Sequence, residues 1–133
     1  MDIALRTAQM SFARRYKVGT VLVKDNHIVA IGWNGTPSSA NNNCEHECSD
    51  GSLTTNDNVV HAEMNAVCHC AKNGISTNGA VMYITLSPCV ACAIAMIQAG
   101  VKEVFYHKEY TDLRGLQLLK EANISVFRYN KDI

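Results

Sequence analysis

The chain has 133 residues, in which 12 Lys and Arg balance 12 Asp and Glu and hydrophobic residues make up 47%. We therefore expect a single domain over 1–133, and the apolar content excludes a disordered chain. The balanced charge and a pI of 6.9 give no broad basic surface of the kind that binds nucleic acid.

The first half of the chain predicts a helix followed by a β-hairpin. Apolar residues at helical spacing indicate a helix over residues 2–15, which ends in a basic cluster. Two β-rich runs, Val18–Val23 and His27–Trp33, are separated by a short polar connection typical of an antiparallel hairpin. Residues 34–59 are rich in Asn, Ser, Gly and Thr and predict a long loop. Long loops in compact domains are usually functional, so we expect binding residues there.

The second half alternates helices and strands. A helix over 62–72 is ended by Asn73-Gly74, and Pro88 is expected at the first position of the next helix, which Gly100 ends. The other predicted elements are a strand over 80–86, a helix over 88–99, a strand over 102–107, a helix over 113–122 and a strand over 124–129. The order αββαβαβαβ predicts an α/β fold, a three-layer α/β/α sandwich around a mixed five-stranded sheet.

Six cysteines in a chain of this length could form the disulfides of a small secreted protein. The first residues show no basic segment followed by an apolar run, as a secretory signal would. We therefore expect a reducing, cytoplasmic setting, in which cysteines more often bind metals or pack in the core. No segment approaches the ~20 apolar residues that cross a bilayer, so no membrane association is expected.

Two short segments carry residues suited to zinc chemistry. His61-Ala62-Glu63 and Pro88-Cys89-Val90-Ala91-Cys92 each stand at the start of a predicted helix. The thiols of Cys89 and Cys92 share one helix face, and a helix N-terminus favours the thiolate form. Together with His61 they form a set of three ligands, which leaves a fourth tetrahedral position for water, as in catalytic zinc sites. Glu63 is then placed to move protons beside the metal.

Two other interpretations of these cysteines are open. A C-x-x-C pair also occurs in redox proteins, although the thioredoxin motif has no H-x-E partner. A structural zinc site would need a fourth protein ligand, from Cys68, His69, Cys70 or the loop cysteines. We favour the catalytic interpretation because H-x-E together with P-C-x-x-C is the combination of zinc nucleobase deaminases.

These motifs resemble the zinc-dependent cytidine and deoxycytidylate deaminase superfamily, most closely its deoxycytidylate (dCMP) branch. The similarity extends over nearly the whole chain and includes KVGTVLV (17–23), GWNGTP (32–37), HAEMNA (61–66) and YITLSPCVACA (83–93). The resemblance implies hydrolysis of dCMP to dUMP and ammonia, which supplies the precursor of dTMP. It also implies Zn²⁺ bound by His61, Cys89 and Cys92, with Glu63 as the catalytic acid and base.

The resemblance further implies substrate contacts. Asn34 matches a residue that touches the substrate sugar, and Tyr110 falls where a loop aromatic covers the phosphate. The other expected contacts are Ala62, between His61 and Glu63, and Ser87, directly before Pro88. Candidates for a charged contact with the phosphate are Arg14, Lys17 and Lys108.

The segment Gly32-Trp33-Asn34-Gly35 resembles the effector site of the branch, where dCTP with Mg²⁺ activates and dTTP inhibits. Trp33 stands where tyrosine is usual, so stacking on a nucleotide is retained whereas a hydroxyl hydrogen bond is lost. The resemblance also implies a homo-oligomer, with a hexamer favoured and effector sites near the subunit contacts.

The remaining cysteines have two expected roles. Cys44 and Cys48 flank His46 in the loop and could hold a second, structural zinc, although Val59 stands where a further histidine ligand would help. Cys68 and Cys70 are expected to pack in the core.

Other functions stay open within and outside the superfamily. The alternatives inside it act on dCTP, guanine, riboflavin precursors, tRNA adenosine or free cytidine. Ser87 replaces the Glu usual in the tRNA and guanine branches, and the balanced charge argues against tRNA. A helix over 113–122 makes the last two strands parallel, unlike the hairpin expected in free cytidine enzymes. A non-catalytic nucleotide-binding module is the alternative from another class, and the presence of Glu63 argues against it.

Overall fold

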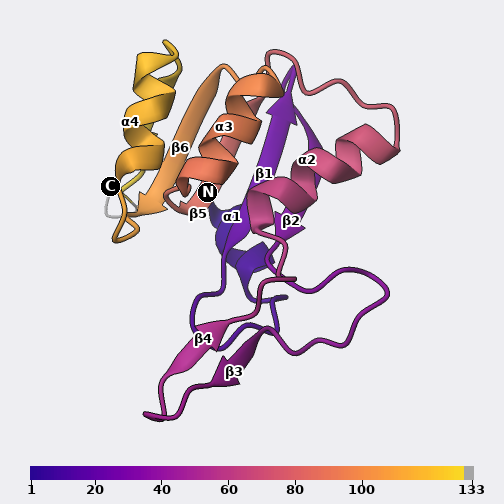
Figure 1. Cartoon of the computed structure of the whole chain (residues 1–133). Helices are drawn as coiled ribbons and strands as arrows, with labels where there is room; N and C mark the ends of the chain where they lie inside the picture. Colours follow the sequence, from indigo (N-terminus) through magenta and orange to yellow (C-terminus); the bar gives the residue numbers. More distant parts are fainter. Residues whose placement is uncertain (131–133) are drawn as a thin grey trace.

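The structure is a computed structural model that describes residues 1–130, and its centre is a five-stranded sheet in the order β2-β1-β5-β6-β7 (Figure 1). Its strands are β1 (Gly19–Lys24), β2 (His27–Trp33), β5 (Val81–Leu86), β6 (Glu103–Lys108) and β7 (Ser125–Arg128). β1 runs antiparallel to β2 and β5, whereas β5, β6 and β7 are parallel. The predicted mixed five-stranded sheet is therefore confirmed.

The β1–β2 connection is a tight hairpin turn. Asp25 and Asn26 have φ angles of 50° and 62°, and Lys24 pairs with His27 across the turn. Two consecutive residues with positive φ give the turn a twist that matches the strands, and Asn and Asp tolerate this conformation better than most residues. The local sequence thus fixes the predicted hairpin.

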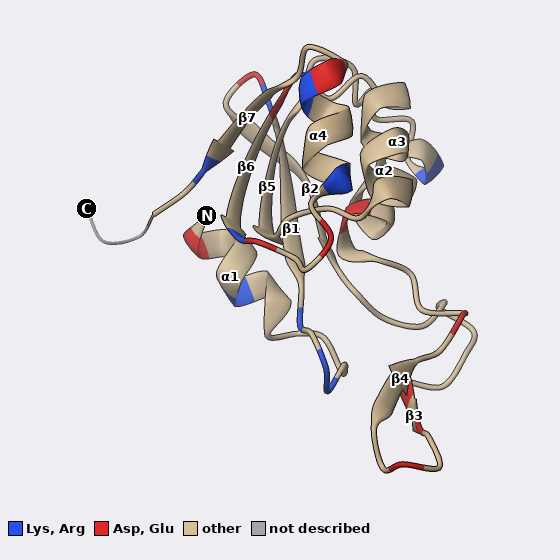
Figure 2. Cartoon of the chain, turned by 60° about the vertical axis from the view of Figure 1, so that its left-hand side comes forward, with Lys and Arg blue, Asp and Glu red and all other residues tan. Residues whose placement is uncertain are grey.

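Helices cover the sheet on both faces. Figure 2 shows α1 (Asp2–Ala8) on one side of the sheet and α2 (Ala62–Lys72), α3 (Val90–Gln98) and α4 (Arg114–Glu121) on the other. Two glycines of the sheet allow the close approach of a helix, Gly19 that of α1 and Gly32 that of α2. A Cβ on Gly19 would lie 2.1 Å from the Ala4 carbonyl oxygen, and one on Gly32 would lie 2.3 Å from that of Ala62. The predicted three-layer sandwich is confirmed.

The hydrophobic core lies mainly between the sheet and the layer of α2, α3 and α4. Its largest fully buried side chains include Leu22, Met82, Ile84, Met96 and Leu119. Core positions alternate along β5, at Met82 and Ile84. They are three residues apart on each helix, at Ala93 and Met96 of α3 and at Leu116 and Leu119 of α4, as helices with one buried face require. The core therefore fixes α2 and α3, whose N-terminal ends carry the two segments with the predicted zinc ligands.

The first helix is shorter than the sequence suggested, because α1 ends at Ala8 and not at residue 15. The hydroxyl of buried Ser11 accepts a hydrogen bond from the Ala13 N–H at 3.1 Å and donates one to the Asn34 carbonyl at 2.7 Å. Such side-chain bonds to the backbone compete with helical bonding. The segment after Ala8 is consequently irregular.

The segment over 34–59 is not a structureless loop. It contains a small antiparallel hairpin of β3 (Glu45–Glu47) and β4 (Leu53–Thr55), which projects beyond the main sheet in Figure 1. Both strands are three residues long and mostly polar, so neither carries the alternation that indicates a strand. The expectation of a long unstructured loop was wrong.

Two further expectations need correction. Pro88 is not the first residue of α3, because α3 begins at Val90 and Cys89 is its N-cap. Cys89 takes that position because its sulfur accepts the Cys92 N–H at 3.5 Å. Cys70 packs in the core as expected, but Cys68 is exposed on the outer side of α2.

The helix ends follow the sequence signals. Gly74 and Gly100 have φ angles of 68° and 82° and stand directly after the C-caps of α2 and α3. Residues 131–133 of the predicted 1–133 domain lie outside the described residues. Within 1–130, no helix has the length and apolar character needed to cross a bilayer.

Candidate active site

Three predicted metal ligands meet where α2 and α3 begin. His61 is the N-cap of α2, Cys89 is the N-cap of α3, and Cys92 lies in the first turn of α3. The His61 Nδ1 atom is 3.5 Å from the Cys89 sulfur and 3.3 Å from the Cys92 sulfur. Across residues 1–130, this is the one group of three or more His, Cys, Asp or Glu side chains whose ligand atoms all lie within 4.8 Å.

The donor set fits zinc. Tetrahedral Zn–N and Zn–S bonds of ~2.0 and ~2.3 Å place a nitrogen and a sulfur ligand ~3.5 Å apart, close to the two spacings around His61. Three protein ligands also leave one tetrahedral position open. The arrangement is therefore suited to a catalytic zinc ion, whereas a fourth protein ligand for a structural site is not among the residues brought together.

Hydrogen bonds within the cluster favour a negative sulfur. The Cys92 thiol and the His61 ring hydrogen-bond to the Cys89 sulfur and lower the pKa of Cys89 to about 4. The same hydrogen bond to Cys89, together with burial, raises the pKa of Cys92, and the bond to Cys89 raises the pKa of His61. Because thiolates are the form that binds metal, Cys89 is prepared as a ligand.

Glu63 lies in the first turn of α2 and is only 5% exposed. Burial raises the pKa of its carboxyl group. Residues two apart do not share a helix face, but His61 is the N-cap and has extended backbone angles, with φ −70° and ψ 154°. His61 can therefore line the same cavity as Glu63. A buried carboxyl beside the cluster is suited to accepting and releasing a proton.

The cavity beside the cluster brings together all four predicted substrate residues, Asn34, Ala62, Ser87 and Tyr110. It is also lined by residues that the sequence analysis did not assign to substrate, among them Ala13, Arg15, Tyr16, Glu45 and Thr55.

Four of these cavity residues are held by hydrogen bonds or a ring contact. Asn34 accepts from the Val18 N–H at 2.8 Å and donates to the Tyr16 carbonyl at 2.7 Å. The Ser87 hydroxyl accepts from the Tyr110 N–H at 2.7 Å, which holds Tyr110 at the cavity. The rings of Tyr110 and Tyr16 then meet edge to face, with centroids 6.0 Å apart. These contacts join segments distant in sequence into one cavity wall.

The basic residues that line the cavity are not the ones expected to contact the phosphate. Arg14, Lys17 and Lys108 do not line the cavity with the zinc cluster, and Lys17 and Lys108 line a neighbouring one. Arg15 lines both cavities, and the sequence analysis missed it. The available signal was the basic run Arg14-Arg15-Tyr16-Lys17, which does not show which member faces the site.

Of the predicted effector residues, only Asn34 lines the main cavity. Gly32 lies beneath α2, and Trp33 is half-buried with its carbonyl accepting from the Asn65 side-chain amide at 2.7 Å. Gly35, which follows Asn34, forms an isolated antiparallel β-bridge with Val60. The effector role of this segment stays a prediction.

The structure does not bring Cys44 and Cys48 into a metal cluster. The Cys44 thiol is 2% exposed and hydrogen-bonds to the Asn42 carbonyl, whereas the Cys48 sulfur is 2.9 Å from the Thr54 hydroxyl. A second zinc at these cysteines stays a prediction that this geometry does not support.

We expect about one zinc ion per chain, because only one three-ligand group is assembled among the residues that the structure describes. Metal analysis of the purified protein checks this expectation. The double variant Cys44→Ser/Cys48→Ser should keep the zinc content, and Cys92→Ser should lose most of it. A ratio near two that falls in the double variant would instead establish the second site.

Residues 1–108 match the family model for the cytidine and deoxycytidylate deaminase zinc-binding region. The chain belongs to this family. It is 41% identical to the dCMP deaminase of cyanophage S-TIM5, whose crystal structure was solved in complex with dCMP and dUMP. That superposition has a TM-score of 0.89 and covers 96% of this chain and 92% of the other.

Two other relatives match nearly the whole chain at lower identity. The deoxycytidylate deaminase of Enterobacteria phage T4 is 30% identical, over 98% of this chain and 88% of its own. The ComE operon protein 2 of Bacillus subtilis is 35% identical, over 94% of this chain and 66% of its own. The chain thus spans 88% of the T4 enzyme and 66%, just under two thirds, of the Bacillus protein.

Proposed function

We propose that this protein is a zinc-dependent deoxycytidylate deaminase, which hydrolyses dCMP to dUMP and ammonia. The observation that carries the proposal is the meeting of His61, Cys89 and Cys92 with buried Glu63 at one cavity. The family supplies the reaction type, and the cyanophage enzyme bound to dCMP and dUMP supports the substrate.

The chemistry divides between the metal and Glu63. Bound zinc supplies Lewis-acid activation of water at neutral pH. Glu63 accepts a proton from the attacking water and delivers it to the pyrimidine ring nitrogen next to the carbon that carries the amine. It then transfers the second proton of that water to the departing amine, so that ammonia leaves, the carbonyl of dUMP forms and the carboxylate is restored. Burial of Glu63 keeps this transfer away from bulk water.

The substrate contacts belong to the same proposal. Following the resemblance, Asn34 contacts the deoxyribose and Tyr110 covers the phosphate end, and Ala62 and Ser87 are further substrate contacts. The support for these contacts is that all four residues line the cavity that contains Glu63.

Regulation and assembly are proposed from the resemblance. dCTP with Mg²⁺ activates and dTTP inhibits through Gly32, Trp33, Asn34 and Gly35. The protein forms a homo-oligomer, with a hexamer favoured, consists of one deaminase domain over 1–133, and acts in the cytoplasm. Light scattering with and without dCTP tests the assembly.

Ammonia release identifies the substrate. The purified zinc protein is incubated with dCMP, dCTP, CMP, deoxycytidine and guanine, each with and without dCTP and Mg²⁺ as effector. We expect dCMP to have the highest kcat/KM. Release from guanine or dCTP but not from dCMP would replace the proposed substrate, and release from none would favour a nucleotide-binding module.

A further inference from the structure

Three asparagines of the chain are directly followed by glycine, in the pairs Asn34-Gly35, Asn73-Gly74 and Asn78-Gly79. Glycine has no side chain to hinder its own backbone nitrogen, so in such a pair this nitrogen can attack the side-chain carbonyl of the asparagine. The attack requires the glycine N–H to leave any hydrogen bond that it makes. The folded structure therefore decides which of the three pairs is reactive.

Backbone hydrogen bonds hold two of these three glycines. The Gly35 N–H donates to the Val60 carbonyl at 3.1 Å, and the Gly35 carbonyl accepts the Val60 N–H at 2.8 Å. The Gly79 N–H donates to the Gly100 carbonyl at 2.7 Å. By contrast, no hydrogen bond found within residues 1–130 has the Gly74 N–H as its donor. Of the three glycines, Gly74 alone therefore has a backbone nitrogen that no such bond restrains.

The Asn73-Gly74 pair is also open to solvent, because it ends α2. Asn73 is the C-cap of the helix, Gly74 follows with a φ of 68°, and both residues are exposed. Ring closure requires the peptide between them to turn from its present orientation, in which the ψ of Asn73 is 10°. This turn disturbs the bond from the Ile75 N–H to the Cys70 carbonyl. Exposed helix ends open locally at little cost in free energy, so the turn is accessible here.

His69 lies one helical turn before Asn73, beside its side-chain amide. The His69 Nδ1 atom is 3.5 Å from the Asn73 Nδ2 atom, and the His69 carbonyl accepts a hydrogen bond from the same Nδ2 at 2.8 Å. Nδ2 is the nitrogen that departs as ammonia when an asparagine deamidates, and it must gain a proton to leave. An imidazole is suited to supplying that proton near neutral pH.

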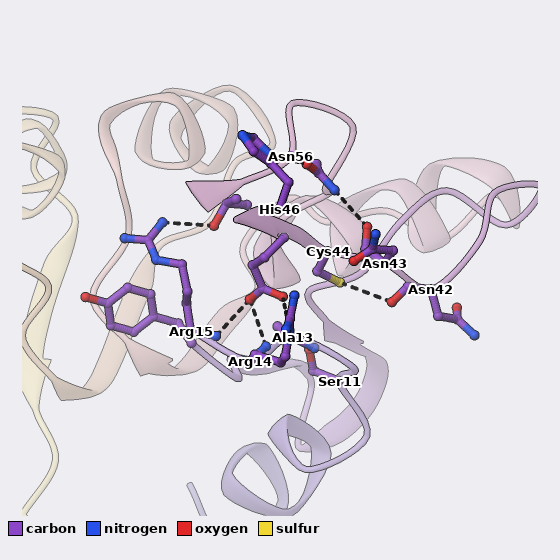
Figure 3. Close-up of polar contacts among 12 residues, drawn as sticks. Ser11, Ala13, Arg14, Arg15, Asn42, Asn43, Cys44, His46 and Asn56 are labelled. Carbon is purple, nitrogen blue, oxygen red and sulfur yellow. Dashed lines mark hydrogen bonds and ion pairs between the residues drawn. The ribbon is translucent and has the colours of Figure 1, made fainter. Parts of the chain in front are cut away.

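The polar residues around the β3–β4 hairpin provide an internal comparison. Figure 3 shows Asn42, Asn43 and Asn56, each of which is followed in the sequence by a residue with a side chain. That side chain hinders the approach of the next backbone nitrogen. The Asn56 amide also donates to the Asn43 carbonyl at 3.0 Å, which holds both residues in place. We expect these three asparagines to stay intact.

We propose that Asn73 is a site of spontaneous deamidation, with His69 as the acid that assists it. The Gly74 nitrogen gives its proton to solvent and bonds to the Asn73 Cγ atom. The Cγ–Nδ2 bond breaks, and Nδ2 leaves as ammonia with a proton from His69, which then regains a proton from solvent. Water opens the resulting cyclic imide at either carbonyl, so that aspartate and isoaspartate form at this position.

The modification weakens the end of α2 without reaching the zinc cluster. A carboxylate cannot donate to the His69 carbonyl, and its negative charge faces the negative end of the helix dipole. His61 and Glu63 stand at the opposite end of this helix of 11 residues, about 15 Å away along its axis. Deamidated protein should therefore lose stability while it keeps its zinc content and its kcat.

The first test measures deamidation at each asparagine of the wild-type zinc protein, aged at neutral pH and physiological temperature. Peptide mass spectrometry follows the mass difference between O and NH, with fragmentation that resolves Asn73 from Asn78. We expect Asn73 to react about 2- to 10-fold faster than Asn78, the factor for releasing one N–H hydrogen bond, and Asn34 to be slowest. Equal rates at the three pairs, or a fastest reaction at Asn34 or Asn78, would overturn the proposal. This readout does not depend on deaminase activity.

The second test uses variants around α2. Asn73→Gln should stop the reaction at this position, because its longer side chain closes a larger ring more slowly. Asn78→Gln is the matched control and should leave the rate at Asn73 unchanged. His69→Gln keeps a polar side chain on the exposed helix face and should slow Asn73 several-fold, less than the ~10²-fold of a positioned enzymatic acid. An unchanged rate in His69→Gln would remove the acid role.

The third test makes the product directly. Asn73→Asp should lower the melting temperature by about 2–6 °C, because the bond to the His69 carbonyl is lost at a helix C-terminus. Its zinc content should match the wild type, and its kcat for dCMP should stay within about 2-fold. Asn42→Asp is the control, since it adds the same charge at an exposed position outside the helices. Equal melting temperatures for the two variants would contradict the proposed effect on α2.

Discussion

Replacement of Glu63 by Gln is expected to lower kcat for dCMP by ~10²- to 10⁴-fold, the contribution typical of a general acid and base. Gln has nearly the same volume as Glu, so the packing around this 5% exposed side chain is kept. The amide cannot accept a proton from water at neutral pH. The loss should therefore fall on the chemical step, with little change in the zinc content.

The measurement pairs steady-state ammonia release with metal analysis of the same sample. Glu47→Gln is the matched control, because it removes an acid at an exposed position of β3. Near wild-type kcat in Glu63→Gln, with zinc still bound, would remove Glu63 from the reaction. A variant that also loses its zinc would assign Glu63 a role in holding the site together.

The layers of the fold follow from the sequence because each helix of the second half buries one apolar face against the sheet. The apolar residues on β5, α3 and α4 form a single cluster, and their spacing along the chain is sufficient to predict which face of each element is buried. α1 is different, because helical spacing continues past Ala8 while the hydroxyl of Ser11 draws the backbone away from a helix. A bond between Ser11 and Asn34 joins segments that no local pattern connects.

The site likewise contains residues that a local sequence pattern predicts and residues that only contacts between distant segments bring together. His61 and Cys89 could be predicted because each is the N-cap of a helix that the sequence delimits, so that adjacent helix starts bring them together. Arg15 and Glu45 could not, since they are 30 positions apart and meet through a backbone N–H. A glutamate in a polar segment predicts a solvated side chain, and only the folded hairpin shows that this one is buried.

Replacement of Gly32 by Ala is expected to lower the melting temperature and kcat together. A Cβ at this position would lie 2.3 Å from the Ala62 carbonyl oxygen and 2.8 Å from the Ala66 nitrogen. Both atoms belong to the backbone of α2, so the helix must move, and overpacking of this kind costs ~1–3 kcal/mol in the free energy of unfolding. Because α2 also carries Glu63 and follows His61, the shift disturbs the zinc cluster as well.

Gly35→Ala separates this packing effect from an effector role. Nothing lies within 4 Å of a Cβ on Gly35, and the φ of Gly35 is not positive. The Gly35→Ala variant should therefore have the melting temperature of the wild type. Thermal melts and dCTP titrations of both variants make the comparison. If the segment binds dCTP, Gly35→Ala changes the activation curve at unchanged stability. If Gly32→Ala instead melts like the wild type and loses only its response to dCTP, Gly32 contacts the effector and the packing argument fails. A third outcome is that Gly32→Ala melts at a lower temperature and loses activation by dCTP, while Gly35→Ala keeps its activation. This result would reflect the movement of α2, because a displaced helix lowers the deaminase activity whether or not a nucleotide binds nearby.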